Sequence, residues 1–486
     1  MCPITIIGLG PGDPRYLTQE AWSVLEVVGE IWLRTKHHPI MPGLPPHLTL
    51  HSFDYLYEEA EDFAQVYETI ASEMLRLGQR PEGVVYAVPG HPLVGEASVR
   101  LILQRAEEAG LAVHVVEGLS FIEPTLTLLR TDVLAGLQVY DAVELAARYH
   151  PPLNPDLPAL VGQLYSRVLA TDVKLTLMNQ YPYEHKVALV HEAGTPEQHV
   201  VRLPLYELDR QDDIAHMTAL YVPPLPGVSG FEGLQDTVAH LRAPDGCPWD
   251  REQTHDSLRA GLLEEAYEVV AAIDAGDVQA LQEELGDLML QILLHVQIAT
   301  EEDEFQMAQV IADIDAKLKH RHPHVWGGQR VKGTGDVLRR WEELKREEKG
   351  GERSVLDGVP AVLPALLQAN TYGQRAARVG FDWTEVGGVT AKIREEIVEV
   401  EAAVTPEEEE AELGDLLFAV VNWARWLEVD PETALRKANA RFARRFCGVE
   451  RMARERGLDM LALTVDGLEL LWQEAKLNDS DKRQDA

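Results

Sequence analysis

The stretch LQEELGDLML at residues 281–290 returns in closely similar form as EAELGDLLFA at residues 410–419. Upstream of each copy lies a second acidic cluster, in LLEEAYEVV at residues 262–270 and in IREEIVEVE at residues 393–401. Each copy therefore reads ExxE, a gap, and then ExxD. Carboxylates three residues apart lie on one face of a helix, so each pair directs two acids the same way. Two such helices packed antiparallel would bring four carboxylates together.

The eight acids of these two patterns are predicted metal ligands. With 80 acidic residues among 486, an acidic face exposed to solvent can show the same spacing. We expect the apolar neighbours of the acids to be buried, where unpaired carboxylates are costly, and this favours a metal site over a purely structural acidic seam. The ligands are, in copy one, Glu265, Glu268, Glu284 and Asp287 and, in copy two, Glu396, Glu399, Glu412 and Asp415.

The chemistry of this site follows from its donor atoms. Hard oxygen ligands without a thiolate favour Mg²⁺ or Mn²⁺ over zinc. Four carboxylates indicate more than one ion, the arrangement suited to phosphoanhydride hydrolysis. Gly286 and Gly414 each stand inside a predicted helix, where glycine costs roughly 1 kcal/mol relative to alanine. We therefore expect a backbone or a ligand to approach closely at both glycines.

The composition limits the class of protein. A length of 486 residues predicts two or three domains, and no apolar run approaches the ~20 residues that span a membrane. The N-terminus reads as a first strand rather than a signal peptide, so a cytoplasmic location is expected. A net charge of −36 argues against a nucleic-acid partner. Only three cysteines occur, none in a CxxC pair, which argues against a disulfide scaffold and a cysteine-based zinc site.

The distribution of strand-like and helix-like segments along the chain predicts a multidomain organisation. Short apolar runs such as ITIIGLG (4–10), GVVYAVPG (83–90) and KLTLMNQ (174–180) predict strands that alternate with helices up to residue 222, so this part is expected to be α/β. Beyond a linker rich in proline and glycine, amphipathic segments predict an all-α second half. The predicted boundaries are 1–222 for the α/β domain, 223–230 for the linker, 231–350 and 351–476 for two helical units, and 477–486 for a disordered tail.

Further motifs surround the acids: GCPWDREQTHDSL at 246–258, KHRHPHVWG at 319–327 and KANARFARRF at 437–446. Together with ExxE and ExxD, they resemble the MazG family of nucleoside triphosphate pyrophosphohydrolases. The resemblance implies Mg²⁺-dependent cleavage of a nucleoside triphosphate into a nucleoside monophosphate and pyrophosphate. It also implies a homodimer and nucleotide contacts at Lys392, Lys437, Asn439, Arg441 and Trp472. A solvated helix face would equally explain Lys437 and Arg441, and a core position would explain Trp472.

The two copies differ in these supporting motifs. Copy one lacks the KANAR sequence of copy two, although it keeps its four acids. We therefore expect copy two to be the stronger hydrolase, with Glu396, Glu399, Glu412 and Asp415 as its catalytic acids, and copy one to be either active or retained for dimer packing.

The first half carries IIGLGPGDPRYLT (6–18), VYAVPGHPLVGEAS (85–98), VVEGLSFIEP (115–124) and VALVHEAGTPEQHVV (187–201). These resemble the tetrapyrrole (corrin/porphyrin) methylase family, which implies two α/β lobes that bind S-adenosylmethionine between them. His91 stands where that family has aspartate, and no pattern identifies a tetrapyrrole acceptor. The whole arrangement resembles the YabN fusion proteins. The residues that the resemblance places at the cofactor are Pro11, Pro89, Gly90, His91, Val94, Ser120, Phe121, Tyr165 and Gly194.

Three classes of function fit the sequence. The first is a nucleoside triphosphate pyrophosphohydrolase with an N-terminal domain that binds S-adenosylmethionine. The second is a bifunctional enzyme that also transfers a methyl group, and the third is a non-catalytic assembly protein built on an acidic helical bundle.

Overall fold

The computed structural model describes the chain except for residues 1–2, 60–62, 338–339, 342–343, 345–353 and 482–486. It separates into two compact units, Met1–Gln309 and Val310–Ala486. The predicted domain boundaries stay predictions: the break near residue 350 lies outside the described residues, and α19 (Val465–Asp481) extends into the predicted tail. Among the described residues, no helix has both the length and the apolar character needed to cross a membrane.

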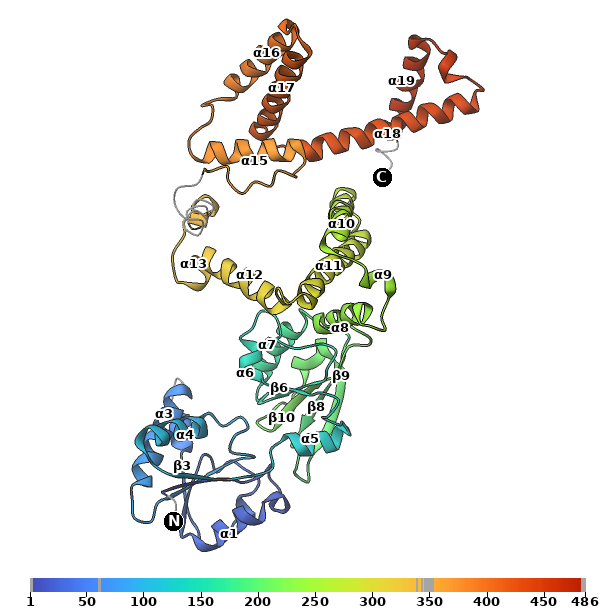
Figure 1. Cartoon of the computed structure of the whole chain (residues 1–486). Coiled ribbons are helices and arrows are strands. Elements are labelled where there is room, and N and C mark those ends of the chain that lie inside the picture. The colour runs from blue at the N-terminus through green and yellow to red at the C-terminus, as the bar shows by residue number, and fades with distance from the viewer. Residues whose placement is uncertain (1–2, 60–62, 338–339, 342–343, 345–353, 482–486) are drawn as a thin grey trace. The chain divides into compact units, whose positions relative to one another are not determined.

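The first sheet is parallel throughout, in the order β3-β2-β4-β1-β5. Every residue of the central strands β1 and β4 is buried, as expected for a parallel sheet that is covered on both faces. Alternate residues of these strands belong to two apolar cores, one shared with α3 and α4 and the other with α1 (Figure 1). The strands are β1 (Ile4–Gly8), β2 (Glu30–Leu33), β3 (Thr49–Ser52), β4 (Val84–Val88) and β5 (Val113–Val116).

The helical elements of this first lobe fill the connections between its strands. They are η1 (Pro14–Tyr16), α1 (Gln19–Val27), η2 (Met41–Gly43), α2 (Asp54–Glu59), α3 (Phe63–Gly78) and α4 (Ala97–Ala109), while α5 (Ile122–Leu129) follows the last of these strands and contacts the second sheet.

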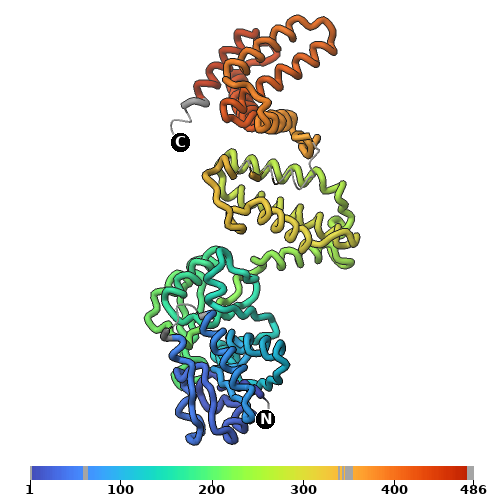
Figure 2. The backbone as a smooth tube through the Cα atoms, turned by 90° about the vertical axis from the view of Figure 1, so that its left-hand side faces the viewer, coloured from blue at the N-terminus to red at the C-terminus, as the bar shows by residue number. Residues whose placement is uncertain are grey.

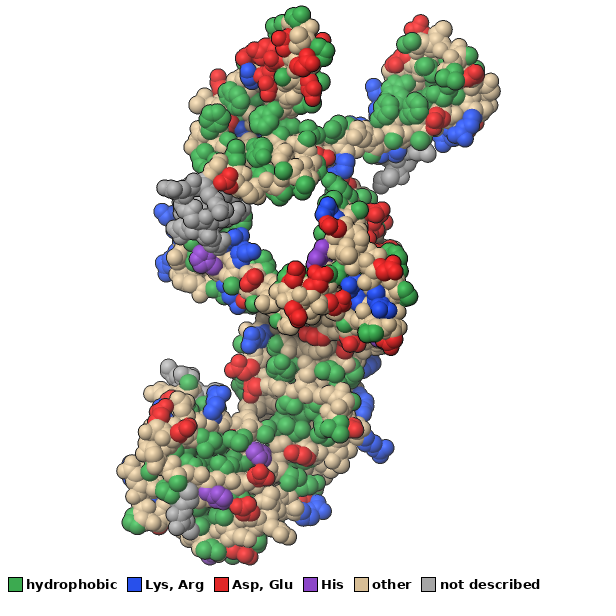
Figure 3. Space-filling view, viewed as in Figure 1, with side chains coloured by type: hydrophobic (Ala, Val, Ile, Leu, Met, Phe, Trp, Pro, Cys, Tyr) green, Lys and Arg blue, Asp and Glu red, His purple; other side chains and the backbone are tan. Residues whose placement is uncertain are grey.

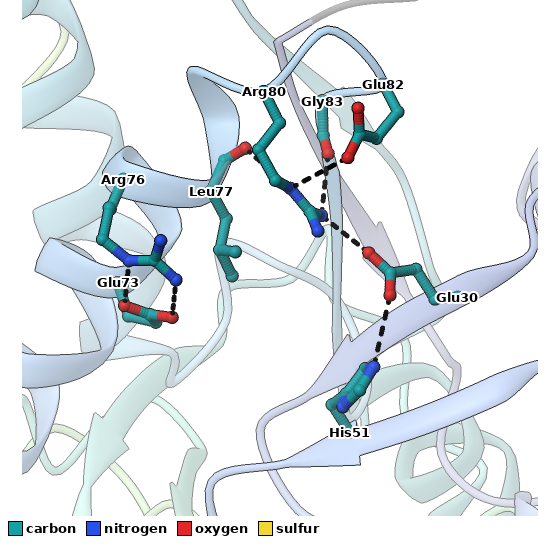
Figure 4. Close-up of polar contacts among 8 residues, drawn as sticks. All are labelled: Glu30, His51, Glu73, Arg76, Leu77, Arg80, Glu82 and Gly83. Carbon is teal, nitrogen blue, oxygen red and sulfur yellow. Dashed lines mark hydrogen bonds and ion pairs between the residues drawn. The ribbon is translucent and has the colours of Figure 1, made fainter.

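Arg80, which lies just beyond the end of α3, connects this helix to β2 and to the turn that leads into β4. Arg80 donates to the carboxylate of Glu30 on β2 at 2.7 Å and to the carbonyl of Gly83 at 3.0 Å. The other oxygen of Glu30 lies 3.3 Å from Nε2 of His51 on β3. Figure 4 shows this chain of contacts, together with the separate pair of Arg76 and Glu73 on α3. The hydrogen bond from Arg80 holds the pKa of Glu30 below its ordinary value.

The second sheet is mixed, in the order β6-β7-β10-β8-β9, with only β6 and β7 parallel. One face packs against α6, α7 and η3 in a single apolar core. Figure 1 shows each sheet in its own lobe, which agrees with the predicted two-lobed α/β fold, and Figure 2 traces the backbone of the same region as a tube. The elements are β6 (Gln138–Asp141), α6 (Ala142–Ala146), β7 (Ala159–Gly162), α7 (Arg167–Leu177), β8 (Lys186–His191), β9 (His199–Pro204), η3 (Leu205–Arg210) and β10 (Thr218–Val222).

The strand predicted at KLTLMNQ (174–180) is wrong, because the structure has α7 there. Ser166 caps this helix by accepting the N–H of Leu169. The buried residues Leu169, Val173 and Leu177 follow helical rather than alternating spacing.

The helical part of the first unit centres on a hairpin of two long helices. It comprises α8 (Phe231–Arg242), α9 (Pro248–Arg251), α10 (His255–Ala275) and α11 (Val278–Glu301). Gly276, with φ of 68°, ends α10, and the side chain of Asp277 caps α11. A left-handed residue favours glycine, so Gly276 and Asp277 together set the reversal between the helices.

The second unit repeats this design in α16 and α17. A capping box at Thr405 and Glu408 begins α17, and α15 packs against α17. A further hairpin is formed by α18 and α19 (Figure 1). The elements are α12 (Met307–Arg321), α13 (Pro323–Trp326), α15 (Ala365–Arg378), α16 (Val386–Ala402), α17 (Pro406–Trp426), α18 (Pro431–Glu455), η4 (Met460–Ala462) and α19. The second half of the chain is helical, as predicted.

Candidate metal and nucleotide site

The hairpin of α10 and α11 brings together three acids of copy one. Glu265 and Glu268 lie on α10 and Glu284 lies on α11, and one ligand atom from each falls within 4.8 Å of the others. Partial desolvation, followed by the neighbouring carboxylates, raises the pKa of Glu265 and of Glu284. The charge of Asp287, one helical turn beyond Glu284, contributes to both shifts. The cluster therefore carries electrostatic repulsion that a cation would relieve.

The hairpin of α16 and α17 forms the matching cluster of copy two. Oxygens of Glu396, Glu399 and Glu412 again lie within 4.8 Å of one another. Glu396 is only 3% exposed, and its Oε2 is buried without a hydrogen-bond partner among the described residues. Desolvation and then the charge of Glu396 raise the pKa of Glu399. Figure 3 shows acidic side chains gathered over this hairpin.

Lys392 is already paired with the acids of copy two. Its Nζ lies 2.7 Å from oxygens of both Glu395 and Glu396. These two hydrogen bonds raise the pKa of Lys392. The four-residue spacing between Lys392 and Glu396 is the sequence signal for this ion pair, which our prediction of a nucleotide contact at Lys392 missed.

The fourth acid of each copy stands slightly apart. Asp287 and Asp415 are exposed and lie one turn beyond Glu284 and Glu412 on the same helices, α11 and α17. The three-atom groups do not include them. Because i and i+3 share a helix face, each aspartate lies on the same side of its helix as the glutamate of its cluster.

The apolar neighbours of the acids are buried only in part: Ala419 and Val421 on α17 are buried, as expected, but the side chains nearest the acids are not. Leu285, Met289 and Ile292 on α11 are each between 42% and 47% exposed, and Leu413 and Leu417 on α17 are about half-exposed. A two-helix hairpin covers only one face of each helix, which leaves the other apolar side chains at the surface.

The expectation that a backbone or a ligand approaches Gly286 and Gly414 closely is wrong for the backbone. A Cβ placed on Gly286 or on Gly414 would meet no described atom within 4 Å. No described backbone therefore approaches either glycine closely, and the space beside both is open.

The remaining predicted nucleotide residues lie on other helices. Lys437, Asn439 and Arg441 are on α18 and Trp472 is on α19, whereas the acids of copy two are on α16 and α17. Trp472 packs beside the apolar core of the α18–α19 hairpin, and its ring centroid lies 5.2 Å from that of Phe442. The structure thus brings Lys392 to the carboxylates but places the other four residues in a second hairpin.

The predicted cofactor residues of the α/β half follow the carboxyl ends of strands. Gly90 and Gly10 exchange backbone hydrogen bonds of 2.8 and 3.2 Å, which joins the segments after β4 and β1. Gly194, with φ of 87°, faces Pro11, whose Cγ would lie 2.5 Å from an added Cβ. Contact between loops thus explains Gly194 without a ligand. The predicted residues are distributed over five segments. Pro11 follows β1, and Pro89, Gly90, His91 and Val94 follow β4. Ser120 and Phe121 follow β5, Tyr165 follows β7, and Gly194 follows β8.

A buried ion pair adjoins the segment after β4. Glu96 is 8% exposed, and its Oε1 accepts from Arg34 at 2.7 Å, while its Oε2 has no hydrogen-bond partner among the described residues. Burial raises the pKa of Glu96 to about 7. The sequence prediction missed this pair, because nothing in the spacing of the two residues signals their contact.

Two family models match this chain in the regions just described. Residues 253–326, which contain the acids of copy one, match the model described as MazG nucleotide pyrophosphohydrolase domain. Residues 3–209 match the model described as Tetrapyrrole (Corrin/Porphyrin) Methylases. The chain belongs to the MazG family and carries a tetrapyrrole methylase domain at its N-terminal side. Both predicted resemblances are therefore confirmed.

Individual relatives span the same regions. The YabN protein of Bacillus subtilis is 39% identical over 97% of this chain and 98% of its own length. The nucleoside triphosphate pyrophosphohydrolase/pyrophosphatase MazG of Thermotoga maritima is 43% identical over 51% of this chain and 96% of its own length. The crystal structure of a uroporphyrin-III-C-methyltransferase from Thermus thermophilus aligns with 20% identity and a TM-score of 0.36, over 45% of this chain and 91% of that one.

Proposed function

We propose that this protein is a divalent-metal-dependent nucleoside triphosphate pyrophosphohydrolase that converts a nucleoside triphosphate and water to a nucleoside monophosphate and pyrophosphate. The observation that carries the proposal is the pair of three-carboxylate clusters, with Oε2 of Glu396 buried and lacking a partner among the described residues. Membership of the MazG family and the name of the Thermotoga maritima relative support the same activity.

The donor atoms of both clusters fit Mg²⁺ or Mn²⁺. Every candidate ligand is a carboxylate oxygen, the donor that these hard cations prefer. Bound divalent ions supply positive charge against the triphosphate and lower the pKa of a bound water. The residues that would hold them are Glu265, Glu268, Glu284 and Asp287 in copy one and Glu396, Glu399, Glu412 and Asp415 in copy two.

Lys392 acquires a second role in this scheme. Its ammonium neutralises Glu396 in the structure, at 2.7 Å. A cation held by Glu396 would take over that neutralisation and leave the Lys392 ammonium available to the triphosphate. Lys437, Arg441 and Asn439 add charge and hydrogen bonds to the phosphates, and Trp472 stacks on the base.

The test of this site compares the two copies. We expect Glu396→Gln to lower kcat for nucleoside triphosphate hydrolysis by more than about 100-fold, since losing a ligand costs more than the 10–100-fold typical of outer-shell changes. Glu265→Gln, the matching change in copy one, is expected to retain most activity. Glu401→Gln is the control, because Glu401 is exposed on the same helix as Glu396. Loss of activity in Glu265→Gln alone would reverse the assignment of the copies, and full activity in both variants would refute the metal site.

We also infer that the α/β half binds S-adenosylmethionine. The match to the tetrapyrrole methylase model and the position of the predicted residues at strand carboxyl ends support this. Calorimetry with S-adenosylmethionine is expected to give one site per chain, weakened by Tyr165→Ala. Absence of binding would contradict the inference. Methyl transfer to an acceptor remains the alternative of a bifunctional enzyme.

Two further proposals concern the oligomeric state of the protein and its partners. The exposed apolar side chains of α11 and α17 support a homodimer that covers them. The net charge of −36 supports a protein without a nucleic-acid partner, and a cytoplasmic location stays a prediction. A purely structural assembly protein, the third class, would show no Mg²⁺-dependent turnover.

A further inference from the structure

A cluster of two histidines and an aspartate lies in the second sheet, outside every site described above. His191 ends β8 and His199 begins β9, and the two are cross-strand partners in the antiparallel ladder. Asp213 lies in the segment that leads to β10. One ligand atom from each of the three residues falls within 4.8 Å of the others.

The distances within this cluster suit a shared cation better than hydrogen bonds. Oδ2 of Asp213 lies 3.4 Å from Nε2 of His191 and 3.7 Å from Nε2 of His199. Hydrogen bonds of this type are ordinarily 2.7–3.2 Å long. In a tetrahedral zinc site with bonds of about 2.0–2.2 Å, neighbouring ligand atoms stand about 3.3–3.6 Å apart.

The burial of His191 is the second, independent observation. His191 is 3% exposed, and its Nε2 is buried without a hydrogen-bond partner among the described residues. A buried ring nitrogen without a partner calls for an explanation, because such atoms are nearly always satisfied in native proteins. This nitrogen is the one that faces Asp213.

The other ring nitrogen of His191, Nδ1, is within hydrogen-bond distance of Thr218. Nδ1 lies 3.2 Å from Oγ1 of Thr218, and that oxygen also accepts the N–H of Ala215 at 2.9 Å. A hydroxyl oxygen has two lone pairs, so Thr218 can accept the Nδ1–H as well. This arrangement fixes the ring and leaves the lone pair of Nε2 directed at the cluster, as outer partners do for histidines that bind metals.

We propose that His191, His199 and Asp213 bind one first-row transition cation, with Zn²⁺ the ion that suits their nitrogen and carboxylate donors. The donor set separates this site from the all-carboxylate clusters of the helical hairpins, which suit Mg²⁺ or Mn²⁺. The proposal does not depend on the hydrolase activity.

Binding requires one local movement. The rings of His191 and His199 are stacked at 4.7 Å with an angle of 14° between their planes. Two nearly parallel rings cannot both direct an in-plane lone pair at one ion, so the ring of His199 turns when the ion binds. The side chain of His199 is 52% exposed and its Nδ1 lies 3.1 Å from the backbone carbonyl oxygen of Glu197, whereas His191 is only 3% exposed, so His199 is the ring that can turn. A water would complete the coordination of the ion.

An ion at this position would tie together the ends of the turn at residues 192–198. This turn contains Gly194, and it contacts the segment after β1 through the hydrogen bond from Asp13 N–H to the Gly194 carbonyl at 3.1 Å. Metal binding is therefore expected to stiffen the edge of the α/β half where the predicted cofactor residues lie.

The test uses Co²⁺ as a spectroscopic probe on the full chain, with excess Mg²⁺ present to occupy the carboxylate clusters. We expect one Co²⁺ per chain with the visible absorption of a four- or five-coordinate site, displaced by Zn²⁺. His199→Ala is expected to lose this absorption. His216→Ala, which removes an exposed histidine of the same segment, is expected to retain it.

A second set of measurements distinguishes loss of the metal site from a folding defect. Circular dichroism of His199→Ala should match the unchanged protein, and Zn²⁺ should raise the Tm of the unchanged protein but not of His199→Ala or Asp213→Asn. Equal Co²⁺ absorption in His199→Ala, or no such absorption in the unchanged protein, would overturn the proposal.

Discussion

A single lysine distinguishes the two acidic clusters at the level of residues. Lys392 stands four residues before Glu396 and bonds to it, whereas the equivalent position before Glu265 is Gly261. Copy two therefore holds a cation of its own beside its most buried acid, whereas no such ion pair joins the acids of copy one within the described part of the chain. This difference agrees with the proposal that the copies do unequal work.

The role of Lys392 can be tested by removing it. Lys392→Ala should tighten Mg²⁺ binding, because no ammonium then competes for Glu396, and it should raise KM for the nucleoside triphosphate roughly 10- to 100-fold. That range corresponds to a hydrogen bond to a charged group of about 1.5–3 kcal/mol. Mg²⁺ titration and steady-state kinetics measure the two effects. Arg394→Ala, which removes an exposed cation of the same helix, is the control. An unchanged KM would show that Lys392 does not contact the substrate.

At the level of elements, the ion pair of Arg80 and Glu30 links the end of α3 to β2. Both side chains are partly exposed, so Arg80→Ala should lower the free energy of unfolding by only about 1 kcal/mol. Arg76→Ala removes a pair on the surface of α3 itself and should lower the free energy of unfolding by less than Arg80→Ala does. Chemical denaturation of both variants near neutral pH measures the difference.

The pH dependence of this link has a definite sign. The pKa of Glu30 is lowered in the folded chain, so the unfolded state binds the proton more tightly. The stabilisation is complete above the ordinary pKa of glutamate and is lost as the pH falls through the lowered value. The deficit of Arg80→Ala should therefore shrink on acidification, and a deficit that is independent of pH would contradict the ion pair.

Patterns within an element were readable from the sequence, while contacts between elements were not. The spacing of Glu265 and Glu268 on one helix predicts their shared face, and the structure has that face. The strand predicted at residues 174–180 failed because the Ser166 cap and the apolar period of α7 outweigh local β-branched character. The meeting of His191 with Asp213 depends on sheet register and on a loop, neither of which short-range spacing encodes. The sequence signal of this meeting is a histidine on each side of EAGTPEQ (192–198).

At the level of the whole molecule, the exposed apolar side chains of the hairpins call for a partner surface. Phe418 and Leu417 on α17 are 44% and 52% exposed, beside the acids of copy two. The sequence predicted these residues as buried from their character alone, which does not reveal whether the cover comes from the same chain.

We expect the protein to sediment as a dimer, since burial of this apolar surface is favourable. Leu417→Arg, which places a charge on that face, should shift the equilibrium toward monomer by at least about tenfold in Kd. Analytical ultracentrifugation measures this, with Val404→Arg, at an exposed position between α16 and α17, as the control. A monomeric unchanged protein would contradict the dimer.

We propose that the carboxylate clusters cleave a nucleoside triphosphate between its α and β phosphates. The most direct measurement incubates the full chain with each nucleoside triphosphate and Mg²⁺ and separates the products. We expect nucleoside monophosphate and pyrophosphate in equal amounts, and no turnover when the metal is chelated. Nucleoside diphosphate with phosphate, or no turnover in Mg²⁺, would contradict it.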